Sequence, residues 1–350
     1  MSFPGKIFAG VLAAFALMGG AGTAHADDEG GGIPREIEAA VDHGLEWLSK
    51  TQQRDGQWNA GGGAGGATAA ASGLATMAFM ARGHVPGQGP YGSVINKGVD
   101  AILADQNANG VIAAVSSNGQ MYEHGICTVA LCEVYGMLDD DRQGKARVAI
   151  AKAVRVILDA QNPSGRPKNA NDMGGWRYTP NSTDSDISVT GWQLMALRGA
   201  SNAGANIPQK AIQDGIDYIK RRAVYGGGFS YNTNSGPNAA RSGTGVLALS
   251  LMGQPDAPEV RAGGDFLLHA QDVTSGDGHY YYTVYYCSQA AWQLGGTYWA
   301  ALNNTISASI RSKQRGDGSW GGGESSDAYC TAMAILALTV PYRYLPIYQR

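Results

Sequence analysis

The chain has few charged residues and no excess of positive charge. Asp, Glu, Lys and Arg make up 16% of its 350 residues, and 26 basic against 29 acidic residues give a net charge of −3. A disordered chain would be richer in charge and poorer in the hydrophobic residues that reach 44% here. A nucleic-acid-binding protein would show a basic excess. The composition therefore indicates a folded protein with no nucleic-acid partner.

Several familiar signatures are also missing. The sequence has no Gly-x-Ser-x-Gly elbow, no P-loop, no dinucleotide-binding fingerprint and no Gly-Cys-Gly-Glu-Gln thioester. Beyond the N-terminal region, no stretch approaches the roughly 18 uninterrupted apolar residues that a membrane-spanning helix needs. Glycine is abundant, at 51 residues, but without the Gly-X-Y period of collagen. The glycines must therefore serve turns and close packing.

The first 26 residues have the features of a secretory signal peptide. Lys6 precedes an apolar run over residues 7–18, and Ala24-His25-Ala26 is a small-x-small cleavage site. We expect cleavage before Asp27, a flexible Gly-rich leader over residues 27–34, and an exported protein that is periplasmic or secreted. A retained membrane anchor is the alternative.

One pattern recurs through the rest of the chain with a period of about fifty residues. Each copy has an amphipathic segment, a Gln, a Gly-rich turn that often carries Trp, and a second segment of small and apolar residues. The glutamines are Gln52, Gln106, Gln161, Gln271 and Gln314, and a sixth, degenerate copy lacks its Gln. A helix that is apolar on all sides is buried on all sides. We therefore predict an all-α fold, an (α/α)6 toroid in a single domain over residues 35–345, with six inner helices sheathed by six outer ones.

The repeat resembles the Gln-Trp motif of squalene–hopene and oxidosqualene cyclases, and that of protein prenyltransferase β subunits. Residues 190–197 and 331–338 are similar to the inner-helix signature of these proteins, and the resemblance covers roughly residues 35–342. It implies the toroid fold and, as one hypothesis, an isoprenoid-type ligand. The same toroid also serves lyases, lanthipeptide cyclases and complement-type proteins, so the resemblance does not define the activity.

The cyclases carry Asp-x-Asp-Asp-Thr-Ala at the start of one inner helix, where a protonated Asp attacks an alkene. Asp184 and Asp186 lie at one such position here, and Asp327 and Tyr329 at another. Alignment of the repeats puts Asp186 and Asp327 on the first Asp of the motif, but Ser188 and Tyr329 on the acid. The catalytic candidates are Asp184, Asp186, Asp327 and Tyr329. We expect neither position to hold a buried acid of raised pKa, and helix N-capping is the alternative role for Asp184 and Asp327.

Three cysteines, Cys127, Cys287 and Cys330, occupy one equivalent position of the repeat. By analogy with the prenyltransferases, which hold zinc near the N-terminal ends of the inner helices, the resemblance implies a possible zinc site with His124 as a further ligand. Helix N-termini would favour the thiolate forms. The alternatives are plain core positions and a Cys287–Cys330 disulfide formed after export.

Aromatic residues provide a candidate lining for the interior of the ring. In the cyclases, aromatic faces stabilise carbocations, and Trp192, Tyr282, Tyr286 and Trp292 could form such a lining here. Stacking against the preceding turns is the structural alternative.

Three functions remain open at this point. The first is binding or transformation of an isoprenoid or other hydrophobic small molecule. The second is a polysaccharide-active toroid, lyase-like, that uses Arg177, Arg241 and Tyr231 at its rim. The third is a non-catalytic scaffold that holds a protein partner, which predicts an interior filled by the protein's own side chains.

Overall fold

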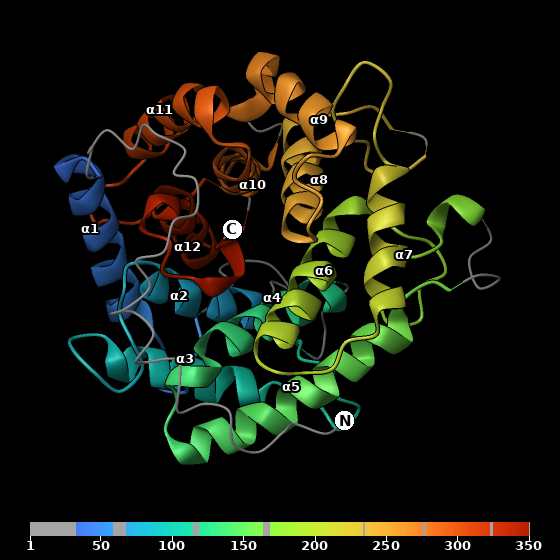
Figure 1. The fold of residues 1–350 in the computed structure, drawn as a ribbon. Helices are drawn as coiled ribbons and strands as arrows, with labels where there is room; N and C mark the ends of the chain where they lie inside the picture. The colour runs from blue at the N-terminus through green and yellow to red at the C-terminus, as the bar shows by residue number, and fades with distance from the viewer. Residues whose placement is uncertain are drawn as a thin grey trace, which may run out of the picture.

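In the part of the chain that this computed structural model describes, twelve α-helices alternate between an outer and an inner layer (Figure 1). The structure describes residues 33–58, 68–114, 119–163, 169–233, 235–275, 278–322 and 325–349, so the expected signal peptide and most of the expected leader lie outside it. The outer helices are α1 (Arg35–Thr51), α3 (Gly92–Ala104), α5 (Asp140–Ala160), α7 (Gln209–Lys220), α9 (Pro258–His269) and α11 (Gly296–Ser312). The inner helices are α2 (Thr68–Ala81), α4 (Gln120–Val134), α6 (Ile187–Asn202), α8 (Ala239–Leu251), α10 (Tyr280–Leu294) and α12 (Asp327–Leu338).

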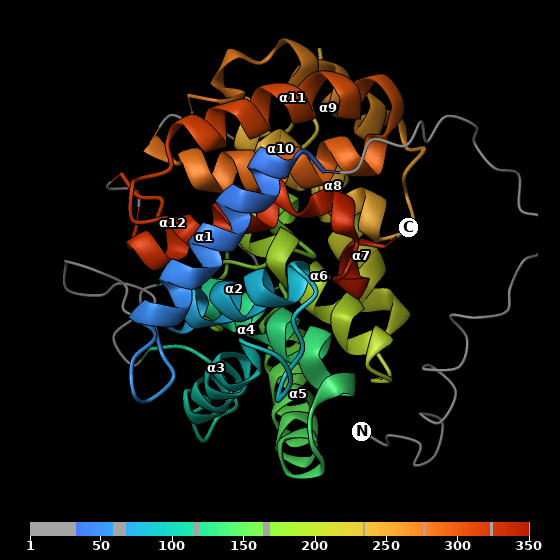
Figure 2. The ribbon, with the colours of Figure 1, turned by 90° about the vertical axis from the view of Figure 1, so that its left-hand side faces the viewer.

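The inner helices form a closed ring. Each contacts the next in chain order, and α12 contacts α2. Where the chain returns to its start, α1 packs beside α12 (Figure 2). Within the described ranges there are only isolated β-bridges and no strand. The predicted (α/α)6 toroid is confirmed. We call the end of the ring at the N-termini of the inner helices the ring mouth.

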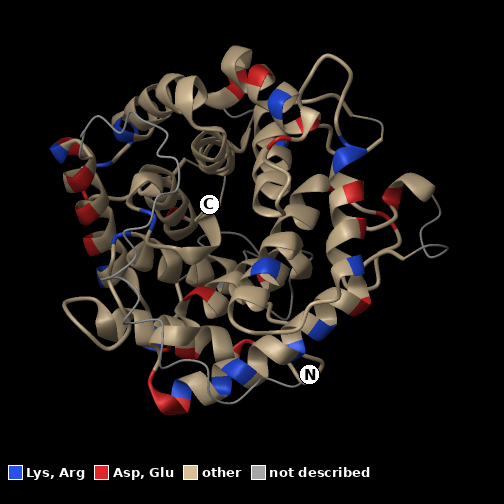
Figure 3. Ribbon diagram, viewed as in Figure 1, with Lys and Arg blue, Asp and Glu red and all other residues tan. Residues whose placement is uncertain are grey.

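The two layers differ as their sequences require. Helix α1 buries Val41, Leu45 and Leu48 on one face, while Glu46 and Lys50 form an exposed ion pair at 2.6 Å on the other. The inner helices are buried almost throughout; in α6, for example, nearly every residue before the last turn is buried. Figure 3 shows the charged residues gathered mainly on the outer layer. No described helix has the length and apolar character needed to cross a bilayer.

Four of the five repeat glutamines link successive repeats. Each donates from Nε2 to the carbonyl of its own turn glycine and to a carbonyl in the next outer helix. The acceptor pairs are Gly56 and Val94, Gly110 and Ala149, Gly174 and Ala211, and Gly318 and Ala40, at distances of 2.8–3.0 Å. The last pair, made by Gln314, joins the final turn to α1 and so closes the outer layer. Gln271, by contrast, is exposed at the start of a 3-10 turn.

Turn tryptophans explain several of the helix glycines. The indole Nε1 of Trp176 donates to the Ile157 carbonyl at 2.7 Å, and its ring lies against Gly215 of the next outer helix. A Cβ on Gly215 would lie 3.3 Å from that ring and 2.6 Å from Leu194. The same relation joins Trp58 to Gly98 and Trp320 to Gly44. Glycine is needed at these positions because the ring packs directly on the helix backbone.

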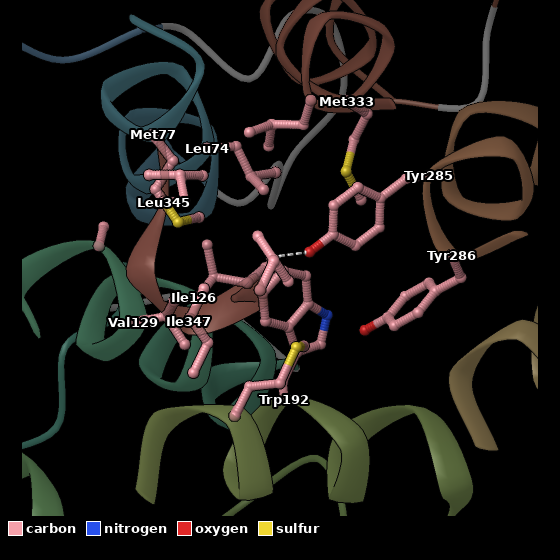
Figure 4. Close-up of a cluster of buried hydrophobic side chains, with 14 of the residues drawn as sticks. Leu74, Met77, Ile126, Val129, Trp192, Tyr285, Tyr286, Met333, Leu345 and Ile347 are labelled. Carbon is pink, nitrogen blue, oxygen red and sulfur yellow. Dashed lines mark hydrogen bonds between the residues drawn. The ribbon is translucent and has the colours of Figure 1, made fainter. Parts of the chain in front are cut away.

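After α12 the chain turns back into the ring. A 3-10 turn, η5 (Val340–Tyr342), is followed by Arg343, whose φ of 57° is left-handed, and by a second turn, η6 (Pro346–Tyr348). Leu345 and Ile347 are buried. Figure 4 shows both among side chains of the inner helices. The interior at this end is therefore filled by the protein itself.

Candidate functional site

Asp186 is a buried carboxyl group at the ring mouth. It is the N-cap of α6, and its Oδ1 accepts a hydrogen bond from the Val189 backbone at 2.9 Å. Its Oδ2 lies 3.3 Å from Arg177 Nε and accepts a hydrogen bond from the Tyr231 hydroxyl at 3.3 Å. The side chain is fully buried, and burial raises its pKa to about 6 despite these partners. The expectation that this helix start lacks a buried acid of raised pKa is therefore wrong.

An arginine and two tyrosines enclose this carboxyl group. The Arg177 guanidinium lies 4.5 Å from the centre of the Tyr178 ring and 5.4 Å from that of Tyr231, and the two tyrosine hydroxyls contact each other. Arg177 also pairs with Asp184 at 2.9 Å, and its side chain is 20% exposed. Residues from two successive turns thus form one rim that presents a cation and hydroxyl groups at the surface.

An aromatic path leads from the mouth into the ring. Tyr282 is half-buried, and hydrogen bonds to Ser188 and Thr244 only partly offset the burial that raises its pKa to about 12. Its ring centre lies 4.6 Å from that of Tyr286, which meets Trp192 edge-on at 6.0 Å. Three of the four predicted lining residues, Trp192, Tyr282 and Tyr286, are therefore brought together.

The path continues through a stacked pair of rings. Trp192 lies parallel to Tyr285, with ring centres 5.8 Å apart, and Tyr286 meets Tyr285 edge-on at 4.9 Å (Figure 4). All three side chains are buried. Sequence reasoning did not single out Tyr285, although it follows the same run of tyrosines.

The fourth predicted lining residue, Trp292, does not line the interior. Its ring meets Trp299 of α11 edge-on at 4.9 Å, and the Arg343 guanidinium lies 4.9 Å from its centre. Trp292 is half-buried at the end of the ring opposite the mouth. The prediction failed because the residue lies two turns beyond Tyr285 on α10, where the helix meets the outer layer.

Asp184 and Asp327 are not helix caps. The N-caps of α6 and α12 are Asp186 and Ser326, whose side chains accept from backbone N–H groups. The Asp184 side chain is 57% exposed, and that of Asp327 is 44% exposed and pairs with Arg315 at 2.6 Å. Both are surface carboxylates in ion pairs.

The predicted catalytic residues also fall on opposite sides of the ring. Asp184 and Asp186 precede α6, whereas Asp327 and the half-buried Tyr329 lie in the first turn of α12. In the closed ring, two inner helices separate α6 from α12 on either side. The two pairs therefore belong to different places, and only the α6 pair includes a buried carboxyl group.

The cysteines do not come together as the predicted zinc ligands. Cys127 on α4 and Cys287 on α10 are on opposite sides of the ring, and each thiol points at the preceding inner helix, toward the carbonyls of Ala69 and Ala239. No group of three or more His, Cys, Asp and Glu side chains in the described ranges is arranged to hold a metal ion. The Cys287–Cys330 disulfide is not formed either.

The cysteine environments do not favour thiolates. Burial raises the pKa of Cys127 and Cys287 well above the usual range, the reverse of the expected effect of the helix N-termini. All four cysteines are buried. Cys127 and Cys287 each lie seven residues after the start of their helix, beyond the first turn in which the helix dipole acts, and burial is the largest cause of the raised pKa.

His124 is engaged in the scaffold. Its Nδ1 accepts a hydrogen bond from the Ile112 backbone at 3.0 Å, and its Nε2 lies 3.1 Å from the Ala153 carbonyl. Burial lowers its pKa to about 4, so the ring is neutral. In a repeat whose turn lacks Trp, His124 links the turn to the next outer helix and has no ring nitrogen left for a metal.

Sequence reasoning placed Arg177 and Tyr231 at a rim but did not single out Tyr122 and Tyr178. Tyr178 follows the turn tryptophan by two residues, and its carbonyl accepts from Met121 at the start of α4. The Tyr122 ring lies 5.9 Å from that of Tyr178. The position of Tyr178 two residues after the turn tryptophan Trp176 is the sequence feature that could have identified it as a rim residue.

The closed double ring defines an (α/α)6 toroid whose mouth carries a buried acid. A family model for the prenyltransferase alpha-alpha toroid domain matches residues 42–279, and the chain belongs to this family. No curated protein sequence matches the chain.

Solved structures share the fold at low sequence identity. An inactive variant of the α-1,6-mannanase GH76A of Salegentibacter sp. HEL1_6, in complex with α-1,6-mannotriose, superposes with a TM-score of 0.64 at 10% identity, covering 87% of this chain and 98% of that one. The type II terpene cyclase MstE from Scytonema gives 0.56 at 12% identity, with 89% and 99% covered. A variant of MstE in complex with its substrate, geranylgeranyl dihydroxybenzoate, gives 0.54 at 11%, with 89% and 98% covered. The toroid is thus shared by terpene cyclases and polysaccharide-active enzymes.

Proposed function

We propose that the ring mouth binds an isoprenoid-type molecule that carries a hydroxyl or carboxylate head. The head lies against Arg177, Tyr231 and Asp186, and the apolar chain runs along Tyr282 and Tyr286. The observation that carries this proposal is the junction of a buried carboxyl group with an aromatic path that leads into the ring.

The rim suits a polar head. Arg177 and the Tyr231 hydroxyl can donate hydrogen bonds to a hydroxyl or carboxylate oxygen, and charge-assisted bonds of this kind are the stronger ones. Asp186 has a pKa near 6, so it can offer a proton to the head in mildly acidic medium and accept one in neutral medium.

The path below suits an apolar chain. The rings of Tyr282, Tyr286 and Trp192 contact one another in succession, from the half-buried mouth to the buried interior. Aromatic side chains contribute a large apolar contact area in defined geometry. MstE, which shares the fold, has been seen with a ligand of this kind, a geranylgeranyl chain on an acidic aromatic head.

We propose binding, without cyclisation started by protonation of an alkene. In the cyclase resemblance, Ser188 and Val189 stand where two carboxylates belong. Asp186 is held by Arg177, Tyr231 and the Val189 N–H, contacts that all stabilise its ionised form. A carboxyl group so stabilised is a poor donor to an alkene carbon.

Calorimetric titration with geranylgeranoic acid, geranylgeraniol and α-1,6-mannotriose tests the proposal. We expect saturable binding of the two isoprenoids. Arg177→Gln should weaken the binding of geranylgeranoic acid by about tenfold or more, because a hydrogen bond to a charged group contributes roughly 1.5–3 kcal/mol. The same substitution should weaken the binding of geranylgeraniol less. Arg155→Gln is the matched control, since Arg155 pairs with Asp159 on the outer face of α5 and its side chain is 75% exposed.

Two results would overturn the proposal. The first is the absence of saturable binding for both isoprenoids. The second is mannotriose binding that depends on Arg177 without isoprenoid binding, which would favour a polysaccharide-directed toroid. The polar rim supports a polysaccharide-directed toroid as the alternative. The guanidinium groups of Arg177 and Arg241 lie 5.4 and 5.5 Å from the centre of the Tyr231 ring.

A filled interior favours a second candidate, the non-catalytic scaffold. Leu345 and Ile347 occupy the end opposite the mouth, as that hypothesis predicts (Figure 4). Cross-linking of the intact protein in its own cell extract, with capture lost in a rim variant that still folds, such as Tyr231→Phe, would support a protein partner at the mouth.

We also propose that the protein acts after export, in the periplasm or outside the cell. The features of residues 1–26 support this. Recovery of a chain that begins at Asp27 from the periplasmic or culture fraction is the expected result, and an uncleaved cytosolic chain would contradict it.

A further inference from the structure

The side chains of Leu345, Ile347 and Tyr348 occupy the ring interior at the end opposite the mouth. We call residues 345–349 the C-terminal plug. Of its side chains, Ile347 is fully buried, and Leu345 and Tyr348 are 4% and 6% exposed. Figure 4 shows Leu345 and Ile347 among Met77 and Val129 of the inner helices, beside Trp192. The plug thus reaches the buried end of the aromatic path.

Polar contacts from three inner helices hold the plug. Glu133 of α4 accepts a hydrogen bond from the Ile347 backbone at 3.0 Å. Gln293 of α10 donates to the Tyr348 carbonyl at 2.9 Å, and Arg198 of α6 donates to that of Gln349 at 3.3 Å. Separate side-chain hydrogen bonds therefore attach the plug to the inner helices.

The fit between plug and ring is incomplete. A small cavity remains between Leu345, Tyr348 and the inner helices, and Gln289 lines it. The buried Oε1 of Gln289 has no hydrogen-bond partner in the described part of the chain. An unpaired buried amide oxygen costs free energy that exposure to water would recover. Release of the plug would therefore cost less than release of a fully hydrogen-bonded segment.

The plug also meets the residues that would hold a ligand. The Tyr348 hydroxyl contacts that of Tyr285, and Tyr285 stacks on Trp192. A short chain bound along Tyr282 and Tyr286 would stop above this point, whereas a longer one would enter the space taken by Ile347 and Tyr348.

We propose that the C-terminal plug is autoinhibitory: it occupies the inner half of the ligand site, and a long-chain ligand binds by displacing it. This inference rests on the proposed isoprenoid function. A binding-competent state that is populated only in part lowers the apparent affinity by that fraction. Removal of the plug should therefore strengthen the binding of long chains and leave short chains unchanged.

The experiment compares the intact chain, a chain that ends at Tyr344, and the substitution Tyr348→Ala. Val148→Ala is the control, because Val148 lies on the outer helix α5, away from the plug, and is 52% exposed. With geranylgeraniol, we expect binding about tenfold tighter for the two plug variants, as if the plug were withdrawn about a tenth of the time in the intact chain. With geraniol, all four proteins should bind alike. Circular dichroism establishes that each variant folds, and Tyr348→Ala is decisive if the shortened chain does not.

A second measurement separates failure of the plug inference from failure of the proposed function. The apolar dye anilinonaphthalene sulfonate should bind the folded plug variants more than the intact chain, whatever the natural ligand is. Equal geranylgeraniol affinity in all four proteins would overturn the plug inference and leave the isoprenoid function standing. Greater dye binding without any isoprenoid binding would overturn the function and retain the plug as a closure of the ring. No difference in either measurement would overturn the inference.

Discussion

The charge state of Asp186 provides the most direct test of the site. The carboxyl group is fully buried, and burial raises its pKa from 3.8 to about 6. Below the unfolded pKa the group is protonated in both states and the folded protein has its full stability. As the pH rises through the folded pKa, the group ionises more readily in the unfolded chain, so stability is lost. A shift of about two units corresponds to about 3 kcal/mol between roughly pH 4 and pH 7.

The substitution Asp186→Asn isolates this effect. Asn is also a good N-cap, so it can still accept from the Val189 N–H, but it does not titrate. Other titrating groups such as Glu133 and His124 are common to both proteins and cancel in the difference. The loss of the Arg177 partner gives an offset that is constant over this pH range.

Urea unfolding, followed by circular dichroism between pH 4 and pH 7, is the assay. The stability of the intact protein relative to Asp186→Asn should fall by about 3 kcal/mol over this range. Asp184→Asn is the control for removing a neighbouring carboxylate, because the Asp184 side chain is 57% exposed and also pairs with Arg177. A flat difference for Asp186→Asn would refute the reasoning, since it would mean that the carboxyl group is not desolvated.

Three further predictions concern the scaffold. Gln314→Ala removes two hydrogen bonds that close the outer layer, and should cost about 1–3 kcal/mol in urea unfolding; an unchanged midpoint would contradict the closing role. Gly215→Ala places a Cβ 2.6 Å from Leu194 and should destabilise by roughly 1–3 kcal/mol. Gly144→Ala, on α5 with nothing within 4 Å, should instead stabilise by about 0.5–1 kcal/mol, and equal effects would refute the packing argument. The four buried cysteines should react with Ellman's reagent only on unfolding, and added zinc should not raise the melting temperature; fast labelling of the native protein would contradict their burial.

The repeat and its apolar segments were enough to predict the toroid. Local sequence determines which helices are amphipathic and which are apolar throughout, and a period of about fifty residues leaves each hairpin to bury its apolar face against the next. Among the aromatic residues, Trp192, Tyr282 and Tyr286 were found from sequence because their positions follow the inner-helix register. Trp292 was misplaced because register alone does not tell where an inner helix meets the outer layer.

The equivalent positions of the cysteines in the repeat led to the wrong prediction that their side chains lie close together. Cys127 and Cys287 do occupy equivalent positions, but equivalent residues in a closed ring are related by rotation about its axis. Each thiol therefore faces its own preceding helix, and the thiols are dispersed around the ring. A shared place in a repeat thus predicts a shared environment and not a shared site.

By itself, the sequence determined the helical hairpins, their number and their order around the ring, since these depend on short-range pattern and on burial of one face. The tertiary structure decided the rest. Asp186 acquires its raised pKa because the folded ring mouth buries it, and Arg177 and Tyr231, from successive turns, offset that shift only in part. Ile347 is buried in the ring, where Glu133, far away in the chain, accepts its backbone N–H. Both depend on contacts between residues distant in sequence, which no local pattern records.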